Sequence, residues 1–107
     1  MIYISNSFSL QMLNHEHVSY VEVTPIEIGE VKKLISKGFI STIGHPDTAR
    51  LLTTLLGTHI PYNRINIKLN LEDVLIVAQV VGGRLPEGCT TLPEGIEIKF
   101  FKVCLVW

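Results

Sequence analysis

The chain is poor in cysteine and has no excess of charge of either sign. Its two cysteines, Cys89 and Cys104, show no CxxC spacing and have no third partner, which argues against a zinc site and against a disulfide framework. Nine Lys and Arg residues against ten Asp and Glu residues give a net charge of −1. A broad positive face for long nucleic acid is therefore not expected, although a few well-placed donors could hold a small anionic ligand.

Long apolar runs are also lacking. No run approaches the roughly 18–20 residues that span a membrane, and the N-terminus has neither the basic start nor the apolar stretch of a signal peptide. We therefore expect a cytoplasmic protein, in the host cytoplasm if the gene is viral, that contacts no membrane. The chain has 107 residues, 47% of them hydrophobic, so we expect residues 1–107 to form a single domain with one core.

Motifs of metal-dependent and of nucleophilic catalysis are missing too. The chain has no acidic cluster of the kind that holds two metal ions, and it has no defensible Ser-His-Asp arrangement. Gly82-Gly83 lacks the spacing and the following helix of a phosphate-binding glycine motif. We expect neither a metal nor a cofactor, so any phosphodiester cleavage by this chain has to proceed without a metal.

The apolar pattern that is present predicts an α/β fold. Short alternating or wholly apolar runs indicate strands, whereas apolar residues three and four positions apart indicate helices. Together they predict a mixed sheet of about five strands flanked by two main helices. The expected strands are residues 1–5, 18–23, 64–70, 74–81 and 96–107, with a hairpin turn at 71–73 and a loop at 82–95.

The first predicted helix has clear start and stop residues. Thr24 is its predicted N-cap, Pro25 its first residue, and Glu27 the reciprocal partner in a capping box. Gly38 is the predicted stop, because glycine readily adopts the left-handed conformation that ends helices.

The start of the second predicted helix is the first of four polar clusters. Pro46 fits the first helical position, so His45 is the predicted N-cap, and Gly57 closes the helix. The unpaired N–H groups and partial positive charge of a helix N-terminus attract phosphate. The helix dipole disfavours the imidazolium form of His45, whereas an arriving phosphodiester favours it, so a bound phosphate could make His45 a proton donor. The alternative, that His45 merely replaces one of the usual capping residues, has equal weight on sequence alone.

Arg84 and Glu87 form a second cluster, in the loop that follows a buried strand. An arginine there could clamp a phosphate, and the glutamate could orient a histidine or a hydroxyl. Taken alone, the pair is better explained as a surface ion pair around a turn.

The remaining two clusters are ambiguous when each is taken alone. Arg64, Asn66 and Lys68 share one face of a predicted strand, and that face is either solvent-exposed or the floor of a ligand site. The segment from Asn6 to Ser9 follows the first strand, and strand ends in α/β domains are favoured ligand positions, but an ordinary turn has the same composition.

In their order along the chain, the clusters are similar to those of the viral type III anti-CRISPR ring nucleases, small proteins of archaeal viruses with relatives in bacteria and their phages. The resemblance spans nearly the whole chain. No single motif is specific, but the ordered set at these spacings is. The set is Asn6-Ser7-Phe8-Ser9, Ile43-Gly44-His45 with Thr48, Gly57-Thr58, Asn63-Arg64 and Arg84-Leu85-Pro86-Glu87-Gly88.

The resemblance implies a homodimer of α/β subunits that binds cyclic tetra-adenylate across its interface. It also implies cleavage of this ring without metal into linear di-adenylates, which silences type III CRISPR signalling. His45, Arg84 and Glu87 match the catalytic positions. The positions that match ligand contacts are Asn6, Ser9, Gly44 and Arg64. The short segment between Gly88 and the last strand departs from the family, since relatives can carry a longer piece there.

Two other functions stay open on the sequence. A non-catalytic dimer could sequester a cyclic oligonucleotide without cutting it. A structural or DNA-binding protein is the weakest alternative, because the chain has no basic helix and no recognition-helix pattern.

Overall fold

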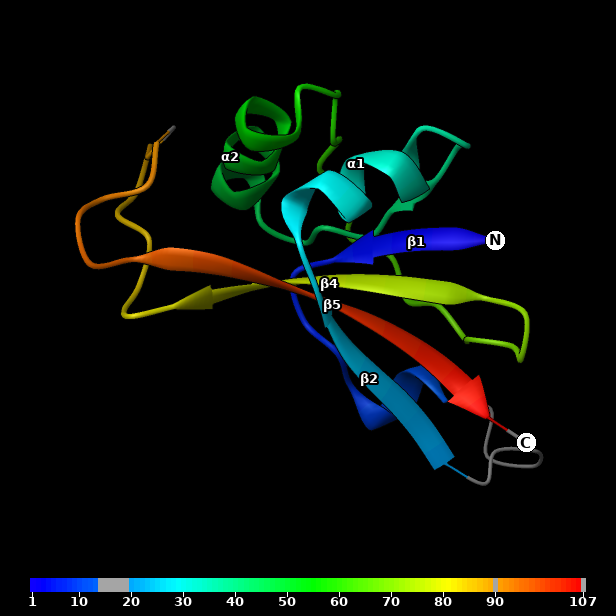
Figure 1. Cartoon of the computed structure of the whole chain (residues 1–107). Helices are drawn as coiled ribbons and strands as arrows, with labels where there is room; N and C mark the ends of the chain where they lie inside the picture. The colour runs from blue at the N-terminus through cyan, green and yellow to red at the C-terminus, as the bar shows by residue number, and fades with distance from the viewer. Residues whose placement is uncertain (14–19, 90, 107) are drawn as a thin grey trace.

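Five strands form one mixed sheet in the computed structural model, which describes residues 1–13, 20–89 and 91–106 (Figure 1). In spatial order the strands are β2 (Tyr20–Ile26), β5 (Glu97–Val106), β4 (Val74–Val81), β1 (Ile2–Ser5) and β3 (Ile40–Ser41). β1 pairs in parallel with β3 and β4, whereas β5 pairs antiparallel with β4 and β2. The predicted fold class, a mixed sheet of about five strands with two helices, is therefore confirmed.

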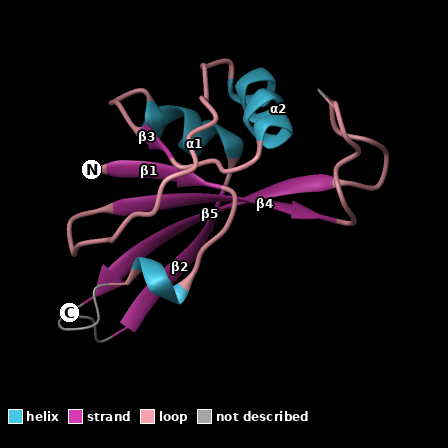
Figure 2. Cartoon of the chain, turned by 180° about the vertical axis from the view of Figure 1, so that it is seen from behind, coloured by secondary structure: helices cyan, strands magenta, loops and turns pink. Residues whose placement is uncertain are grey.

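The helices α1 (Ile28–Ile35) and α2 (Pro46–Leu56) lie on one face of the sheet. The short 3-10 helix η1 (Leu10–Met12) lies on the opposite face, as the reverse view shows (Figure 2). No helix in the described part of the chain is long and apolar enough to cross a membrane.

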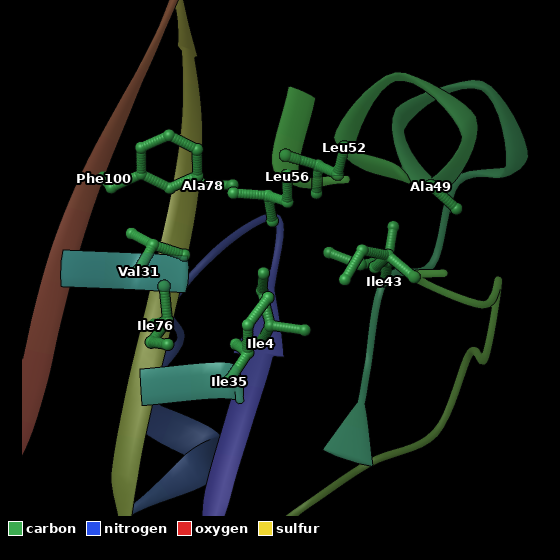
Figure 3. Packing of buried hydrophobic residues seen from close by; sticks show 11 residues of the cluster. Ile4, Val31, Ile35, Ile43, Ala49, Leu52, Leu56, Ile76, Ala78 and Phe100 are labelled. Carbon is green, nitrogen blue, oxygen red and sulfur yellow. The ribbon is translucent and has the colours of Figure 1, made fainter. Parts of the chain in front are cut away.

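The core follows from the alternation of side chains along β4. Ile76 and Ala78 join the apolar cluster under the helices, whereas Leu75 and Val77 join the cluster on the opposite face. Figure 3 shows the first cluster, in which Leu52 of α2 lies with other buried side chains from both helices and the sheet. This packing fixes α2, and with it the residues at its start, over the parallel part of the sheet.

The first helix begins later than the sequence predicts. Thr24 and Pro25 belong to β2, and the helix begins at Ile28 with Glu27 as an N-cap that makes no side-chain capping bond. The predicted capping box is wrong, because pairing with β5 holds this segment extended. An edge strand tolerates the missing N–H of proline. The predicted stop is confirmed, since Gly38 follows the helix with φ +100°.

The predicted strand at 64–70 does not form. Both sides of β4 are occupied, by β1 and by β5, so the expected hairpin partner has no free edge to pair with. The segment is tied near its ends instead: Asn63 N–H donates to the Ile43 carbonyl (2.9 Å), and Leu69 N–H donates to the Met12 carbonyl (2.7 Å). The fifth strand is the two-residue β3, where the sequence predicted no strand.

The other elements agree with the prediction. α2 has His45 as N-cap and Pro46 in its first turn, and it ends at Gly57 in the left-handed conformation. Of the predicted strand at 18–23, residues 20–23 lie in β2, and 18–19 lie outside the described residues. The last predicted strand corresponds to β5, with residue 107 outside the described residues, and 82–95 is a loop where described.

Candidate functional site

The carboxyl ends of three parallel strands lie at the same end of the sheet, and the polar clusters follow these strands. β1 runs parallel to β3 and to β4, so their carboxyl ends point the same way, which is where α/β domains commonly bind ligands. Asn6 follows β1, Gly44 and His45 follow β3, and the 82–95 loop follows β4 on the side of α2 (Figure 1). Segments far apart in the sequence thus meet at the start of α2.

His45 opens α2 without acting as a side-chain cap. Its backbone is extended (φ −135°, ψ 121°), Pro46 follows in the first turn, and no capping hydrogen bond comes from the imidazole. The side chain is exposed to solvent. Substitution for an ordinary capping residue therefore does not account for a histidine at this position, since the imidazole satisfies no N–H group of the helix.

Asn6, Gly44 and Arg64 lie together next to His45. The Gly44 N–H donates to Oδ1 of Asn6 at 3.1 Å. A Cβ atom at Gly44 would lie 3.4 Å from Cγ of Arg64, so the Arg64 side chain lies across this glycine. The structure therefore brings together three of the four residues that match ligand contacts.

Arg84 reaches the same place from the loop after β4. A hollow of ≈ 440 Å³ is lined by Asn6, His45, Thr48, Arg84 and Leu85, together with Val80 and Gly83. Thr48 is buried, whereas His45 and Arg84 are exposed. The hollow therefore has an imidazole and a guanidinium on its rim, beside the first turn of α2.

Glu87 lies on the other side of His45. It lines an adjoining hollow of ≈ 530 Å³ together with His45, Asp47, Arg50 and Leu85, and with Pro46 and Gly88. His45 and Leu85 line both hollows. Within the described residues no ion pair joins Glu87 to Arg84, so the surface pair that the sequence left open is not formed.

Asp47 is the buried carboxylate of the site. Its Oδ2 accepts the Gly88 N–H at 3.0 Å, and its Oδ1 accepts from the Arg50 guanidinium. The Gly88 N–H, followed by the Arg50 bond, lowers the pKa of Asp47 below its usual value. The group is a carboxylate at neutral pH and joins α2 to the loop that carries Glu87.

Ser9, the fourth residue matched to a ligand contact, lies apart from His45. Its hydroxyl caps η1 by accepting the Gln11 N–H at 3.2 Å. It lines a third hollow with Gln11 and the segment 65–68, where Lys68 Nζ donates to the Gln11 carbonyl. The structure does not place Ser9 in either hollow beside His45.

The arrangement suits proton transfer at a phosphate ester. An imidazole can give or take a proton, a guanidinium pairs with phosphate oxygens, and the N-terminus of α2 adds a partial positive charge. Among the described residues no group of three or more His, Cys, Asp and Glu side chains could hold a metal ion.

Asp47, Thr48 and Leu85 had no role predicted from the sequence. Asp47 was not recognised as a site residue, because its partner Gly88 is 41 residues away. An acidic residue in the first turn of a helix usually needs no explanation beyond the helix dipole. Burial of its side chain, at 7% exposure, is the signal that the sequence could not give.

A model of one protein family matches most of this chain. The family is described as STIV B116-like, and the match covers residues 2–102. Protein 26 of Sulfolobus islandicus filamentous virus (isolate Iceland/Hveragerdi) is 39% identical over 90 residues, which is 82% of this chain and 74% of the relative. ORF117 of Acidianus two-tailed virus is 37% identical over 70 residues, which is 63% of this chain and 59% of that protein.

A solved structure has the same fold. B116 of Sulfolobus turreted icosahedral virus superposes with a TM-score of 0.77, at 24% sequence identity, and the match covers 96% of this chain and 97% of that one. At this identity the likeness establishes the arrangement of strands and helices.

Proposed function

This chain belongs to the STIV B116-like family, which includes proteins of archaeal viruses, and we propose that it is a metal-independent ring nuclease. It binds cyclic tetra-adenylate at the interface of a homodimer and cleaves the ring to linear di-adenylates, which counters type III CRISPR signalling. The observation that carries the proposal is the meeting of His45, Arg84 and Glu87 along two adjoining hollows at the start of α2.

The substrate supplies its own nucleophile. The ribose 2′-OH attacks the adjacent phosphorus in line, the bond to the 5′-oxygen breaks, and the products carry a 2′,3′-cyclic phosphate and a 5′-OH. The 2′-OH loses its proton to solvent water, and the departing 5′-oxygen takes a proton from the protein. The protein has to hold this geometry, stabilise the charge on the pentacoordinate phosphorus and supply the proton that the 5′-oxygen takes.

The three residues have distinct roles in this reaction. His45 protonates the departing 5′-oxygen, Arg84 and the N-terminus of α2 stabilise negative charge on phosphorus, and Glu87 orients the reacting groups. Two observations support this role for His45: it lines both hollows, and its imidazole is not used as a helix cap.

Binding uses residues next to these three. Gly44 contacts both Asn6 and Arg64 beside His45, and we assign Asn6, Gly44 and Arg64 to the ring phosphates and riboses nearest the cleaved bond. Ser9 lines a different hollow, so any contact from Ser9 reaches a part of the ring away from that bond. A two-fold homodimer presents each patch twice to a ring with repeated phosphates, which provides local positive charge in a chain of net charge −1.

Incubation with labelled cyclic tetra-adenylate in excess EDTA tests the proposal. The wild-type chain should give linear di-adenylate, whereas His45→Ala should bind the ring and cleave it at least about 100-fold more slowly. Absence of both binding and cleavage by the wild-type chain contradicts the proposal. Cleavage that EDTA abolishes contradicts its metal independence.

Sequestration of the ring without cleavage is the second candidate function. It is favoured by the openness of the site: His45, Arg84 and Glu87 are all exposed, and the described residues between Gly88 and β5 form no helix to cover them. Tight binding at one ring per dimer, with no product from wild type or from His45→Ala, would identify this function.

A further inference from the structure

The loop that carries Arg84 and Glu87 is anchored at two points. At its base, a Cβ atom on Gly82 would lie 2.2 Å from the Gly95 carbonyl oxygen, so the two arms pass in direct backbone contact. Near its tip, the Gly88 N–H donates to Oδ2 of Asp47 at 3.0 Å. In the described part of the chain, this is the one hydrogen bond between the loop and another element.

The anchored N–H belongs to the turn that presents Glu87. The Cys89 N–H donates to the Pro86 carbonyl at 3.2 Å, and Gly88 has φ +76°. A positive φ at the third residue of a turn is the geometry of type II, which requires glycine or asparagine there. Glu87 is therefore the second residue of a turn whose third residue is bonded to α2.

Both carboxylate oxygens of Asp47 are used in contacts with Gly88 and Arg50. Its side chain is buried, and each carboxylate oxygen has one donor, the Arg50 guanidinium on Oδ1 and the Gly88 N–H on Oδ2. His45, two residues earlier, and Glu87 line the same hollow. The carboxylate thus stands between the first turn of α2 and the loop, on the side of His45 where Glu87 lies.

We infer that Asp47 is a positioning residue for the reaction proposed above, on which this inference rests. Its carboxylate holds the turn at residues 86–89 against α2, so that Arg84 and Glu87 stay on the two sides of His45. Asp47 touches no reacting atom in this scheme and acts through the loop. Loss of the contact should therefore lower turnover more than ring binding, because Asn6, Gly44 and Arg64 bind from the body of the domain.

A set of matched variants separates positioning from general stability. Asp47→Ala removes both contacts, Asp47→Asn keeps an oxygen that can accept the Gly88 N–H, and Arg50→Ala removes the ion pair alone. Asp73→Ala is the control, because Asp73 is also buried and accepts a backbone N–H, that of Asn70 at 2.8 Å. It precedes β4, whereas the 82–95 loop follows that strand.

The first readout is the split between kcat and KM for cyclic tetra-adenylate. Asp47→Ala should lower kcat by about 10- to 100-fold, the loss expected when reacting groups are misplaced by about 1 Å. KM should change by less than about threefold. Asp47→Asn should recover most of the loss, to within about threefold of wild type, while Asp73→Ala should keep the wild-type kcat.

The second readout does not depend on catalysis. Hydrogen exchange of the Gly88 amide, followed by NMR, should become at least about tenfold faster in Asp47→Ala and a few-fold faster in Asp47→Asn. In Arg50→Ala it should stay as in wild type. If wild type cleaves no ring, the proposed function fails, and this measurement still decides whether Asp47 holds the loop.

Three results would overturn the inference. They are unchanged Gly88 exchange in Asp47→Ala, a kcat within about twofold of wild type in that variant, or an equal loss of kcat in Asp73→Ala. If Asp47→Ala does not fold, the exchange rate in Asp47→Asn decides: Gly88 exchange no faster than in wild type contradicts the positioning role.

Discussion

The two α-helices begin in the same way but differ in what surrounds their first residues. Each has an N-cap whose side chain makes no capping bond, Glu27 in α1 and His45 in α2. α1 leaves the edge strand β2 beside a groove that includes apolar residues of β5. α2 follows β3, where the ends of three parallel strands bring Asn6 and Arg84 next to His45.

This difference shows that the helix dipole alone does not make a site. Both helices present a partial positive charge at their N-termini, so the dipole cannot distinguish them. The difference lies in topology. Because β1 pairs in parallel with β3 and β4, the polar loops that follow these strands lie at one end of the sheet, and α2 begins there.

The largest expected effect separates the two N-cap residues by turnover. His45→Ala should lower the rate of cyclic tetra-adenylate cleavage by about 10²- to 10⁴-fold, the usual contribution of a positioned general acid. Glu27→Ala should leave the rate unchanged, because Glu27 lines neither hollow beside His45. Single-turnover cleavage of both variants measures this, and an equal loss in both would remove the distinction between the two helix starts.

A second prediction compares how firmly the helices are packed. Leu52 of α2 is fully buried in the cluster of Figure 3, whereas Leu34 of α1 is half-buried at its margin. Leu52→Ala should lower the free energy of unfolding by about 2–5 kcal/mol through lost burial and the cavity left behind. Leu34→Ala should cost roughly 1 kcal/mol. Urea denaturation checks this, and a larger loss at Leu34 would mean that α1 is the better packed helix.

The sequence predicted α2 correctly because local and tertiary preferences agree there. Pro46 at the start and Gly57 at the end act within the helix itself. The predicted start of α1 was wrong because the local signal, Thr24-Pro25 with Glu27, competes with pairing to β5. No local sequence pattern reveals that pairing. The predicted strand at 64–70 fails for the same reason. Polar and apolar residues do alternate there, but β4 already pairs with β5 on one side and with β1 on the other.

The candidate site was predictable where residue type carried the information. The sequence showed a histidine at a helix start, and an arginine and a glutamate after a buried strand. The order of these residues along the chain carried the resemblance to a known family. That they lie close together could be known only from the order of the strands in the sheet. The role of Asp47 could be found only in the structure, because it depends on the burial of the side chain and on a backbone N–H from a loop far away in the sequence.

A third prediction compares the ends of the two helices. Gly57 has φ +65° and Gly38 has φ +100°, and an added Cβ would meet no atom within 4 Å at either position. Only backbone strain then decides the cost. Gly57→Ala should lower the free energy of unfolding by about 1 kcal/mol, because its φ is close to the left-handed minimum. Gly38→Ala should cost more, about 1–3 kcal/mol. Thermal denaturation measures the order, and a larger cost at Gly57 would contradict it.

The smallest expected effect compares the acidic residues in the first turns, Asp47 in α2 and Glu30 in α1. The Gly88 N–H, and then Arg50, lower the pKa of Asp47 in the folded chain. A lowered folded-state pKa stabilises the fold above the unfolded-state pKa of about 3.9, and the stabilisation is lost as the pH falls through the lower folded-state value. The Tm difference between wild type and Asp47→Asn should therefore be constant from about pH 7 to pH 5 and shrink below about pH 4.

Glu30→Gln is the matched control for this pH dependence, because Glu30 is exposed and has no hydrogen-bond partner among the described residues that would hold its carboxylate. Its Tm should stay close to that of wild type at neutral pH, as expected for surface substitutions. A Tm difference for Asp47→Asn that persists unchanged at pH 3 would mean that the amide disrupts packing. The negative charge of Asp47 would then not be what joins α2 to the loop, and the two helix starts would differ in shape rather than in electrostatics.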